Sequence, residues 1–159
     1  MDNRSGPPGM RRATEAISAG NRPRDDALDT VTLVFDDRHR RRVRLTTDAG
    51  EDLLLDLPEA VALAHGDGLR IEDGGWIAVV AAPESLMEIV SDSPGHLVRL
   101  AWHIGNRHLQ AELLEDRIRI RPDYVIAEML RGLGAEVLEV SAPFQPEGGA
   151  YDEGGHSHG

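Results

Sequence analysis

The sequence predicts an α+β protein in which a small N-terminal all-β domain is followed by a ferredoxin-like (βαββαβ) domain, with flexible tails at both ends. Hydrophobic and polar residues largely alternate over residues 30–84, which is typical of strands with one buried face. Over residues 85–146, strand patterns and helix patterns follow one another. Residues 1–29 and 147–159 carry no periodic hydrophobic pattern, which predicts the two tails.

The first predicted tail, residues 1–29, is dominated by turn-forming sequences. Pro7-Pro8-Gly9 and Arg22-Pro23 interrupt any regular element. Only the stretch from Ala13 to Ile17 has a hydrophobic spacing, and it indicates no more than a short helical turn. We therefore expect this segment to be mobile.

Strand and turn signals alternate through the predicted β domain, residues 30–84. The run from Thr30 to Phe35 is rich in β-branched and apolar residues, which favours a strand. Gly66-Asp67-Gly68 marks a turn, and Asp73-Gly74-Gly75 is a strong hairpin signal before the apolar run that begins at Trp76. The predicted strands are 30–35, 42–46, 51–57, 68–72 and 76–80.

Two helices are predicted in the second domain, residues 85–146. Asp92-Ser93-Pro94 supplies a cap and a proline for the first turn of a helix that ends near Ile104, before Gly105-Asn106, a pair that tolerates left-handed geometry. Pro122 opens the second helix, and Gly132 and Gly134 close it. The strands predicted around the helices are 86–90, 109–114, 118–120 and 136–140. This order of elements is that of a ferredoxin-like domain.

The charge of the chain argues against nucleic-acid and membrane partners. Its 159 residues include 28 acidic and 17 basic side chains, all of the latter arginine, for a net charge of −11. This surplus of negative charge repels phosphate backbones and anionic lipid surfaces. No segment approaches the roughly 20 apolar residues of a membrane-spanning helix, and the first residues lack a signal-peptide core. We therefore expect a cytoplasmic protein.

The absence of cysteine limits the chemistry of any site. It excludes disulfides, thiolate metal sites and cysteine nucleophiles, so a bound metal must use imidazole, carboxylate or backbone oxygen. The sequence also contains no Gly-x-Ser-x-Gly elbow, phosphate-binding loop or dinucleotide fingerprint. We therefore expect that the protein is not an enzyme.

The basic cluster is confined to Arg38-His39-Arg40-Arg41-Arg42 together with Arg44. It can recognise an acidic peptide or partner protein, or it can be the solvated face of an edge strand that charge protects from aggregation. We favour the edge strand.

The candidate metal ligands are histidines near the two ends of the second domain. His156 and His158 form a His-x-His pair near the C-terminus, which is either a mobile metal ligand or a solvated tail. His108 follows the Gly105-Asn106 break, where a side chain can project from a turn. One imidazole holds a divalent ion poorly, but a two-fold dimer would place two copies of His108 near its axis.

The remaining histidines are weaker candidates. The spacing of His103 on the first helix favours a half-buried structural residue. We interpret His39, His65 and His96 as surface residues, because they are scattered and show no metal-ligand spacing.

Several motifs together resemble the UreE family of urease accessory proteins, which are nickel metallochaperones. In order and spacing they cover residues 30–151, nearly everything outside the tails. The motifs are Gly66-Asp67-Gly68, Val79-Val80-Ala81-Ala82-Pro83-Glu84, His103-Ile104-Gly105-Asn106-Arg107-His108, Met129-Leu130-Arg131-Gly132-Leu133-Gly134 and Pro143-Phe144-Gln145-Pro146-Glu147-Gly148-Gly149-Ala150-Tyr151.

The resemblance implies a homodimer whose ferredoxin-like domains form the interface and whose β domain contacts partner proteins. It implies that His108 and its symmetry mate bind Ni²⁺, with Zn²⁺ or Cu²⁺ able to substitute, and that His156 and His158 complete the coordination. It further implies that the ion passes to the urease accessory GTPase and, through it, to apo-urease and the other accessory proteins. Many members carry a long histidine-rich terminus, whereas this chain has two histidines after Tyr151. We therefore expect a single tight ion per dimer rather than bulk nickel storage; the alternative is that the shorter tail only weakens binding.

Two rival functions remain open. An interaction scaffold would use the β domain and the arginine cluster, with the histidines incidental. A zinc-dependent hydrolase is the weaker rival, because it would need a general base and a third protein ligand near His108 that the sequence does not show.

Overall fold

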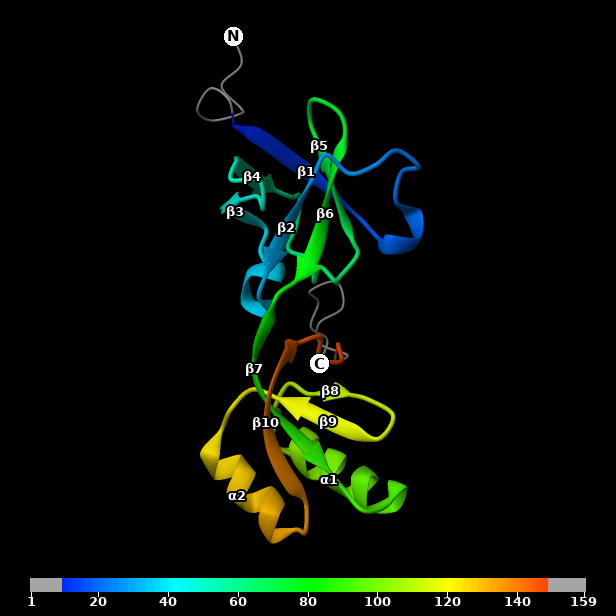
Figure 1. Cartoon of the computed structure of the whole chain (residues 1–159), viewed down its shortest axis with the longest axis vertical. Coiled ribbons are helices and arrows are strands. Elements are labelled where there is room, and N and C mark those ends of the chain that lie inside the picture. The colour runs from blue at the N-terminus through cyan, green and yellow to red at the C-terminus, as the bar shows by residue number, and fades with distance from the viewer. Residues whose placement is uncertain (1–9, 149–159) are drawn as a thin grey trace. The chain divides into compact units, whose positions relative to one another are not determined.

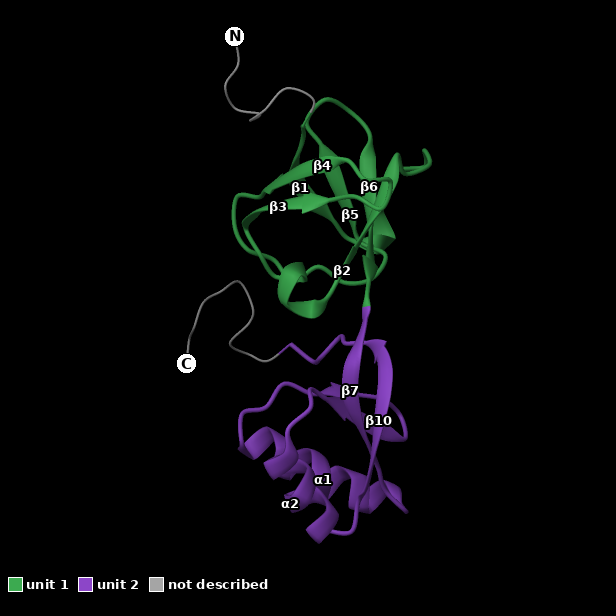
Figure 2. Cartoon of the chain, turned by 60° about the vertical axis from the view of Figure 1, so that its left-hand side comes forward, with its two compact units in different colours: residues 1–82 green, residues 83–159 purple. Residues whose placement is uncertain are grey.

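The computed structural model describes residues 10–148, and the chain divides into two compact units. Unit 1 comprises residues 1–82 and unit 2 residues 83–159, so the division falls between Ala82 and Pro83 (Figure 2). The boundary expected from the sequence lies two residues further on, after Glu84. Each unit has its own hydrophobic core. No helix in the described part of the chain has the length and apolar character needed to cross a membrane.

Unit 1 is built on a sheet whose strand order is β2-β6-β5-β1-β4-β3 (Figure 1). Within residues 10–82 its strands are β1 (Arg11–Ile17), β2 (Asp29–Leu33), β3 (Arg42–Thr46), β4 (Asp52–Asp56), β5 (Gly68–Ile71) and β6 (Trp76–Ala81). The β1–β4 and β2–β6 pairs are parallel, and the others are antiparallel. Two short 3₁₀ helices, η1 (Ala19–Asn21) and η2 (Phe35–Arg38), join the strands. The predicted all-β domain is confirmed.

Strand β1 contradicts the prediction made from the sequence. Residues 11–17, expected to belong to a mobile tail with at most a helical turn, form a strand between β5 and β4. Ala13 is fully buried there and pairs with Leu55 and Ile71. The prediction was wrong because charged and polar residues fill most of β1, so that only Ala13 and Ile17 are buried along it.

The core of unit 1 is formed by alternate residues of the strands. Leu53 and Leu55 on β4, Leu69 on β5 and Ile77 on β6 are all fully buried. Along β4, buried positions alternate with positions that are exposed or partly buried, which is the period-two pattern expected of a strand with one face on a core. The hydrophobic pattern that predicted these strands is therefore the pattern that packs them.

Unit 2 has the strand–helix order predicted from the sequence. Within residues 83–148 its elements are β7 (Pro83–Val90), α1 (Pro94–Asn106), β8 (Glu112–Leu113), β9 (Arg117–Ile120), α2 (Tyr124–Gly132) and β10 (Glu136–Pro143). The sheet order is β10-β7-β9-β8, with every pair antiparallel. This is the arrangement of a ferredoxin-like domain, so the predicted fold class is confirmed.

Side-chain caps set the start of both helices. The Ser93 hydroxyl accepts a hydrogen bond from the His96 N–H at 3.1 Å, and Pro94 occupies the first turn of α1. The Asp123 carboxylate accepts from the N–H groups of Val125 and Ile126, so α2 begins two residues after Pro122. Leu100 and Ile104 of α1 pack with Ile126, Ala127 and Leu130 of α2 in the core of unit 2.

Candidate metal centre

His108 lies in a tight turn that ends α1. Its backbone has φ 59°, and it is the one non-glycine residue with positive φ among residues 10–148. The His108 N–H donates to the Gly105 carbonyl at 2.9 Å, and the Leu109 N–H approaches the Ile104 carbonyl at 3.4 Å. These are the two bonds of a Schellman motif, in which glycine is the usual left-handed residue. Histidine therefore occupies a position whose backbone geometry favours glycine.

This turn differs from the sequence prediction. We expected the helix to end near Ile104, with Gly105-Asn106 adopting left-handed geometry. The helix instead includes both residues, and the left-handed residue is His108. The predicted strand 109–114 is correspondingly reduced to β8, because only Glu112 and Leu113 pair with β9.

The turn places the His108 side chain at the surface, beside a cavity of about 350 Å³. Two segments line this cavity: His108, Leu109 and Gln110 after α1, and residues 120–123, from the last residue of β9 to the residue before α2. Asp123 contributes a carboxylate, although one of its oxygens already caps α2. A metal ion held by His108 would thus be accessible from solvent and next to a negatively charged group.

The described residues supply only part of a metal site. Within residues 10–148, no three histidine, aspartate or glutamate side chains are grouped as metal ligands. His156 and His158, the other predicted ligands, lie outside the described residues. His108 is thus the predicted ligand whose surroundings the structure defines.

His103 lies on α1 but not in the cavity of His108. Its ring is partly buried and meets the ring of Trp102 edge-on, with 5.1 Å between the centroids. Its carbonyl accepts a hydrogen bond from the Arg107 guanidinium at 3.3 Å. These contacts agree with a half-buried structural residue.

Two of the three histidines interpreted as surface residues have defined structural partners. His65 Nδ1 accepts from the Ala81 N–H at 3.1 Å. His96 is partly buried, and its Nε2 donates to the Leu133 carbonyl at 2.7 Å, which joins the start of α1 to the end of α2. Its Nδ1 lies 3.4 Å from the carboxylate of Asp92, four residues earlier. The i,i+4 spacing of Asp92 and His96 is visible in the sequence and is the signal that could have indicated this contact.

The arginine cluster lies on and before β3, which forms one edge of the unit 1 sheet. Arg42 pairs with Asp56 at 2.8 Å and Arg44 with Asp52 at 3.1 Å. Arg38 is 3% exposed and donates to the carbonyls of Leu33 and Leu63. Arg42 and Arg44 are exposed on the edge strand β3, as the edge-strand interpretation predicts, whereas Arg38 is buried in η2 and is not part of a solvated face.

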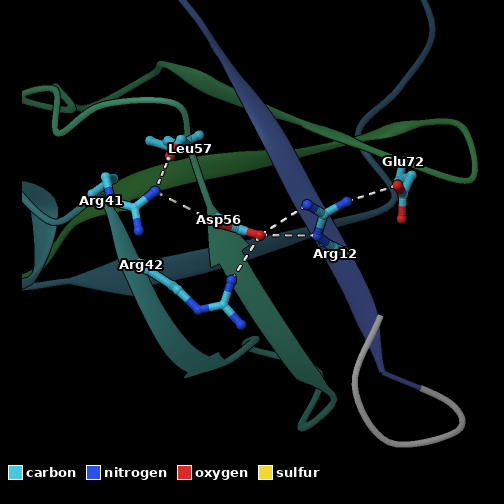
Figure 3. Close-up of polar contacts among 6 residues, drawn as sticks. All are labelled: Arg12, Arg41, Arg42, Asp56, Leu57 and Glu72. Atoms are coloured by element: carbon cyan, nitrogen blue, oxygen red, sulfur yellow. Dashed lines mark hydrogen bonds and ion pairs between the residues drawn. The ribbon is translucent and has the colours of Figure 1, made fainter. Parts of the chain in front are cut away.

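Asp56 is the centre of this charge network (Figure 3). It accepts two hydrogen bonds from the Arg12 guanidinium, at 2.8 and 3.1 Å, in addition to the ion pair with Arg42. Arg12 also pairs with Glu72 at 2.7 Å, so the network links β1, β4 and the turn after β5. The hydrogen bonds from Arg12, followed by those from Arg42, lower the pKa of Asp56 below its ordinary value.

An apolar stripe lies on the solvent side of α1 and leads towards His108. Val98 is 68% exposed and Trp102, one turn later, is 62% exposed. A further turn along, Gly105 leaves open space where a side chain would begin. Large apolar side chains left this exposed on adjacent turns are characteristic of a surface that another protein covers.

Comparison with known proteins finds a matching family model for each of the two units. The family models described as "UreE urease accessory protein, N-terminal domain" and "UreE urease accessory protein, C-terminal domain" match residues 12–82 and 84–159. A protein of Bradyrhizobium sp. (strain ORS 278) named "Urease accessory protein UreE" is 54% identical over 94% of this chain and 71% of its own length. One of the same name from Chelativorans sp. (strain BNC1) is 57% identical over 94% of both chains. A third, from Rhizobium rhizogenes (strain K84 / ATCC BAA-868), is 53% identical over 94% of this chain and 89% of its own length.

Proposed function

Because the chain belongs to the UreE family of urease accessory proteins, we propose that it is a nickel-binding metallochaperone that delivers Ni²⁺ for assembly of the urease metallocentre. The observation that carries the proposal is the exposed imidazole of His108, held out by the left-handed turn that ends α1. In this proposal the protein works in the cytoplasm and passes the ion to the urease accessory GTPase, and through it to apo-urease. As an accessory protein it catalyses no reaction.

A second copy of the chain would supply the second imidazole. One histidine binds a divalent ion weakly, and the described residues offer no complete ligand set. Val98 and Trp102 lie on the exposed face of the helix that leads to His108, so pairing of this face about a two-fold axis would bury them and bring two His108 side chains together. The open space at Gly105 lets the two helices approach closely.

The C-terminal histidines would complete the coordination. The described chain ends at Gly148, next to Glu147, whose N–H donates to the Ala111 carbonyl at 2.8 Å. Ala111 is three residues after His108, so its Cα lies within about 11 Å of the His108 Cα. His156 follows Glu147 by nine residues, which span up to about 30 Å, so both His156 and His158 can reach the imidazole.

Nitrogen ligands at an exposed site suit delivery better than storage. Imidazoles bind Ni²⁺, Zn²⁺ and Cu²⁺, and copper is favoured at any such site, so selectivity depends on metal supply and on the recipient. An open site also lets ligands of another protein enter before the ion leaves. In a closed cage the ion would exchange slowly.

The proposal is tested by following urease activation in cells that carry unmodified protein, His108→Ala, or a chain ending at Tyr151. We expect His108→Ala to abolish nickel-dependent activation and the shortened chain to reduce it. Normal activation by His108→Ala, at unchanged protein level, would instead support the interaction scaffold.

A further inference from the structure

Strand β10 forms one edge of the sheet in unit 2. In the order β10-β7-β9-β8 it has a single neighbour, and all of its residues pair with β7 (Figure 2). Within residues 10–148, no hydrogen bond joins β10 to any strand or loop other than β7. In an antiparallel pair, alternate residues bond to the neighbouring strand, and the others point their N–H and C=O groups away from it. A row of main-chain donors and acceptors is therefore open along the outer side of β10.

This edge lacks the features by which most proteins block further pairing. Edge strands are commonly short, interrupted by proline or a bulge, or covered by another segment. β10 is eight residues long, its one proline is the last residue, Pro143, and its register with β7 has no bulge. The described chain after β10 does not return along it, because the Glu147 N–H donates to the carbonyl of Ala111, just before β8 on the opposite edge. The edge is thus suited to a strand supplied by another molecule.

A cavity of about 440 Å³ lies beside β10 on the face of the sheet that packs against the helices. Met87 of β7 belongs to the core of unit 2, and its cross-strand partner Glu139 lies on the same face. Ser85 and Ser141, the next cross-strand pair on this face, also line the cavity. Tyr124, the first residue of α2, lines it from the helix side and is 75% exposed. The helices therefore leave this end of the sheet uncovered.

The charge on this edge is negative and unpaired. Glu136 and Glu139 are exposed on β10, which carries no basic residue, and neither has an ion-pair or hydrogen-bond partner in the described part of the chain. Two copies of β10 side by side would bring like charges onto neighbouring strands, which makes a second copy a poor occupant. A cationic side chain in the cavity would instead meet the Glu139 carboxylate and the exposed ring of Tyr124. These two groups can hold a guanidinium by an ion pair and a cation–π contact.

We propose that β10 binds an extended, basic segment of a partner protein, which adds as a further strand to the sheet and places an arginine or lysine in the cavity. Alternate residues of that segment would be apolar, since Leu138 and Val140 lie on the other face of β10 and Leu138 is 41% exposed. Pro122 lines both this cavity and the cavity of His108, so the partner would dock next to the proposed metal site. The interaction goes beyond the proposed function and requires no bound ion.

The probe is a fluorescently labelled peptide of about seven residues that alternates arginine and valine. It is titrated into the intact protein without metal, at about 0.15 M salt to screen the attraction to net charge. Glu139→Gln should weaken binding about three- to five-fold, and Tyr124→Ala about two- to five-fold. Three controls should bind the peptide like the parent: Glu59→Gln, which removes an exposed charge from unit 1, Tyr124→Phe, which keeps the ring, and His108→Ala.

Strand addition is tested separately by two peptides of the same charge, N-methylated either at every arginine or at every valine. One set of these amides would face β10 and the other set would face away from it. One peptide should therefore bind at least about ten-fold more weakly, and the other should bind like the unmethylated peptide. Hydrogen exchange of the β10 amides, measured by NMR, adds a direct readout. The amides not bonded to β7 should exchange fast in the free protein and slowly with the unmethylated peptide bound.

Several results would overturn the proposal. It is wrong if the unmethylated peptide does not bind, or if Glu139→Gln and Glu59→Gln weaken binding equally, because the peptide then responds only to net charge. Equal binding of the two methylated peptides would exclude strand addition. Slow exchange of all β10 amides without peptide would mean that a second copy or another part of this chain already covers the edge. Nickel binding by His108 is measured independently of these experiments, so failure of this proposal is distinguishable from failure of the proposed function.

Discussion

His108 combines a left-handed backbone conformation, which is unfavourable for a non-glycine residue, with an exposed side chain. Left-handed geometry costs an ordinary L-residue about 1 kcal/mol relative to glycine, and the Schellman turn requires it at this position. Strain of this kind is concentrated at functional sites, where a side chain is needed despite its cost to stability. The cost at His108 is consistent with selection for the imidazole rather than for the turn.

Substitution of His108 by glycine should therefore stabilise the protein while it removes the proposed ligand. We expect the free energy of unfolding of His108→Gly to rise by about 1 kcal/mol, because glycine adopts the turn without strain. The free energy of unfolding of His108→Asn should lie between those of the parent and His108→Gly, because asparagine tolerates left-handed geometry. Urea denaturation without metal measures the effect, and a glycine variant less stable than the parent would show that the imidazole supports the fold.

Asp56 should contribute to the acid sensitivity of unit 1. Its pKa in the folded protein is lowered, chiefly by Arg12, so the carboxylate stabilises the fold fully above the unfolded-state pKa of about 3.9. That contribution is lost as the pH falls through the lower folded-state pKa. Asp56→Asn should therefore lower the melting temperature at about pH 7. It should also make the melting temperatures at about pH 7 and about pH 3 more alike than they are in the parent.

Asp52→Asn is the control for Asp56, because Asp52 pairs with Arg44 in a more exposed position and should matter less. Melting temperatures followed by circular dichroism at both pH values test the prediction. Equal acid sensitivity in the parent and in Asp56→Asn would show that the Arg12–Asp56–Arg42 network does not contribute to it.

Among the elements, β1 shows most clearly what the sequence could not predict. Strands β2 to β6 were recognisable from alternating or continuous apolar runs bounded by turn signals. β1 was not recognisable, because charged residues such as Arg11, Arg12 and Glu15 separate its apolar residues. The charge of Arg12 is balanced by Asp56 and Glu72, which lie 44 and 60 residues away in the sequence. Such distant compensation leaves no local pattern in the sequence from which a strand could be predicted.

A charge at Ala13 should consequently disrupt unit 1. Ala13 is fully buried between β4 and β5, so an unpaired carboxylate there has no partner and no water. We expect Ala13→Asp to cost about 3 kcal/mol or more and to unfold unit 1, whereas Thr14→Asp, partly exposed on the next position, should have a small effect. If residues 11–17 were a mobile tail, the two variants would be equally stable by thermal unfolding.

The exposed face of α1 should control self-association. Buried aromatic anchors commonly contribute about 2 kcal/mol or more to an interface, so Trp102→Glu should weaken the dimer at least about 30-fold. Leu138→Glu is a suitable control, since Leu138 is also exposed but lies on strand β10. Sedimentation velocity over a range of concentrations measures the self-association of the two variants. Unchanged association of Trp102→Glu would move the interface away from α1.

At the scale of the whole molecule, the fold was more predictable than the site. Helix caps and hydrophobic periods are local, so the sequence indicated the βαββαβ order, both helices and most strands of unit 1 within a few residues. His108 was identified partly from its place after Gly105-Asn106 and partly from the family motif, but the residue that adopts the left-handed turn was predicted wrongly. A complete metal site was not predictable from local patterns, because the proposed site draws on a second copy and on residues outside 10–148.

In the proposed function, the protein is a dimer that holds one transferable ion between two His108 side chains. The most direct test is calorimetric titration of the intact protein and of His108→Ala with Ni²⁺, with the molecular mass measured in parallel by light scattering. We predict a single tight ion per dimer in the intact protein and the loss of tight binding in His108→Ala without loss of the fold. Tight binding that survives the substitution, or binding by a protein that stays monomeric, would contradict this proposal.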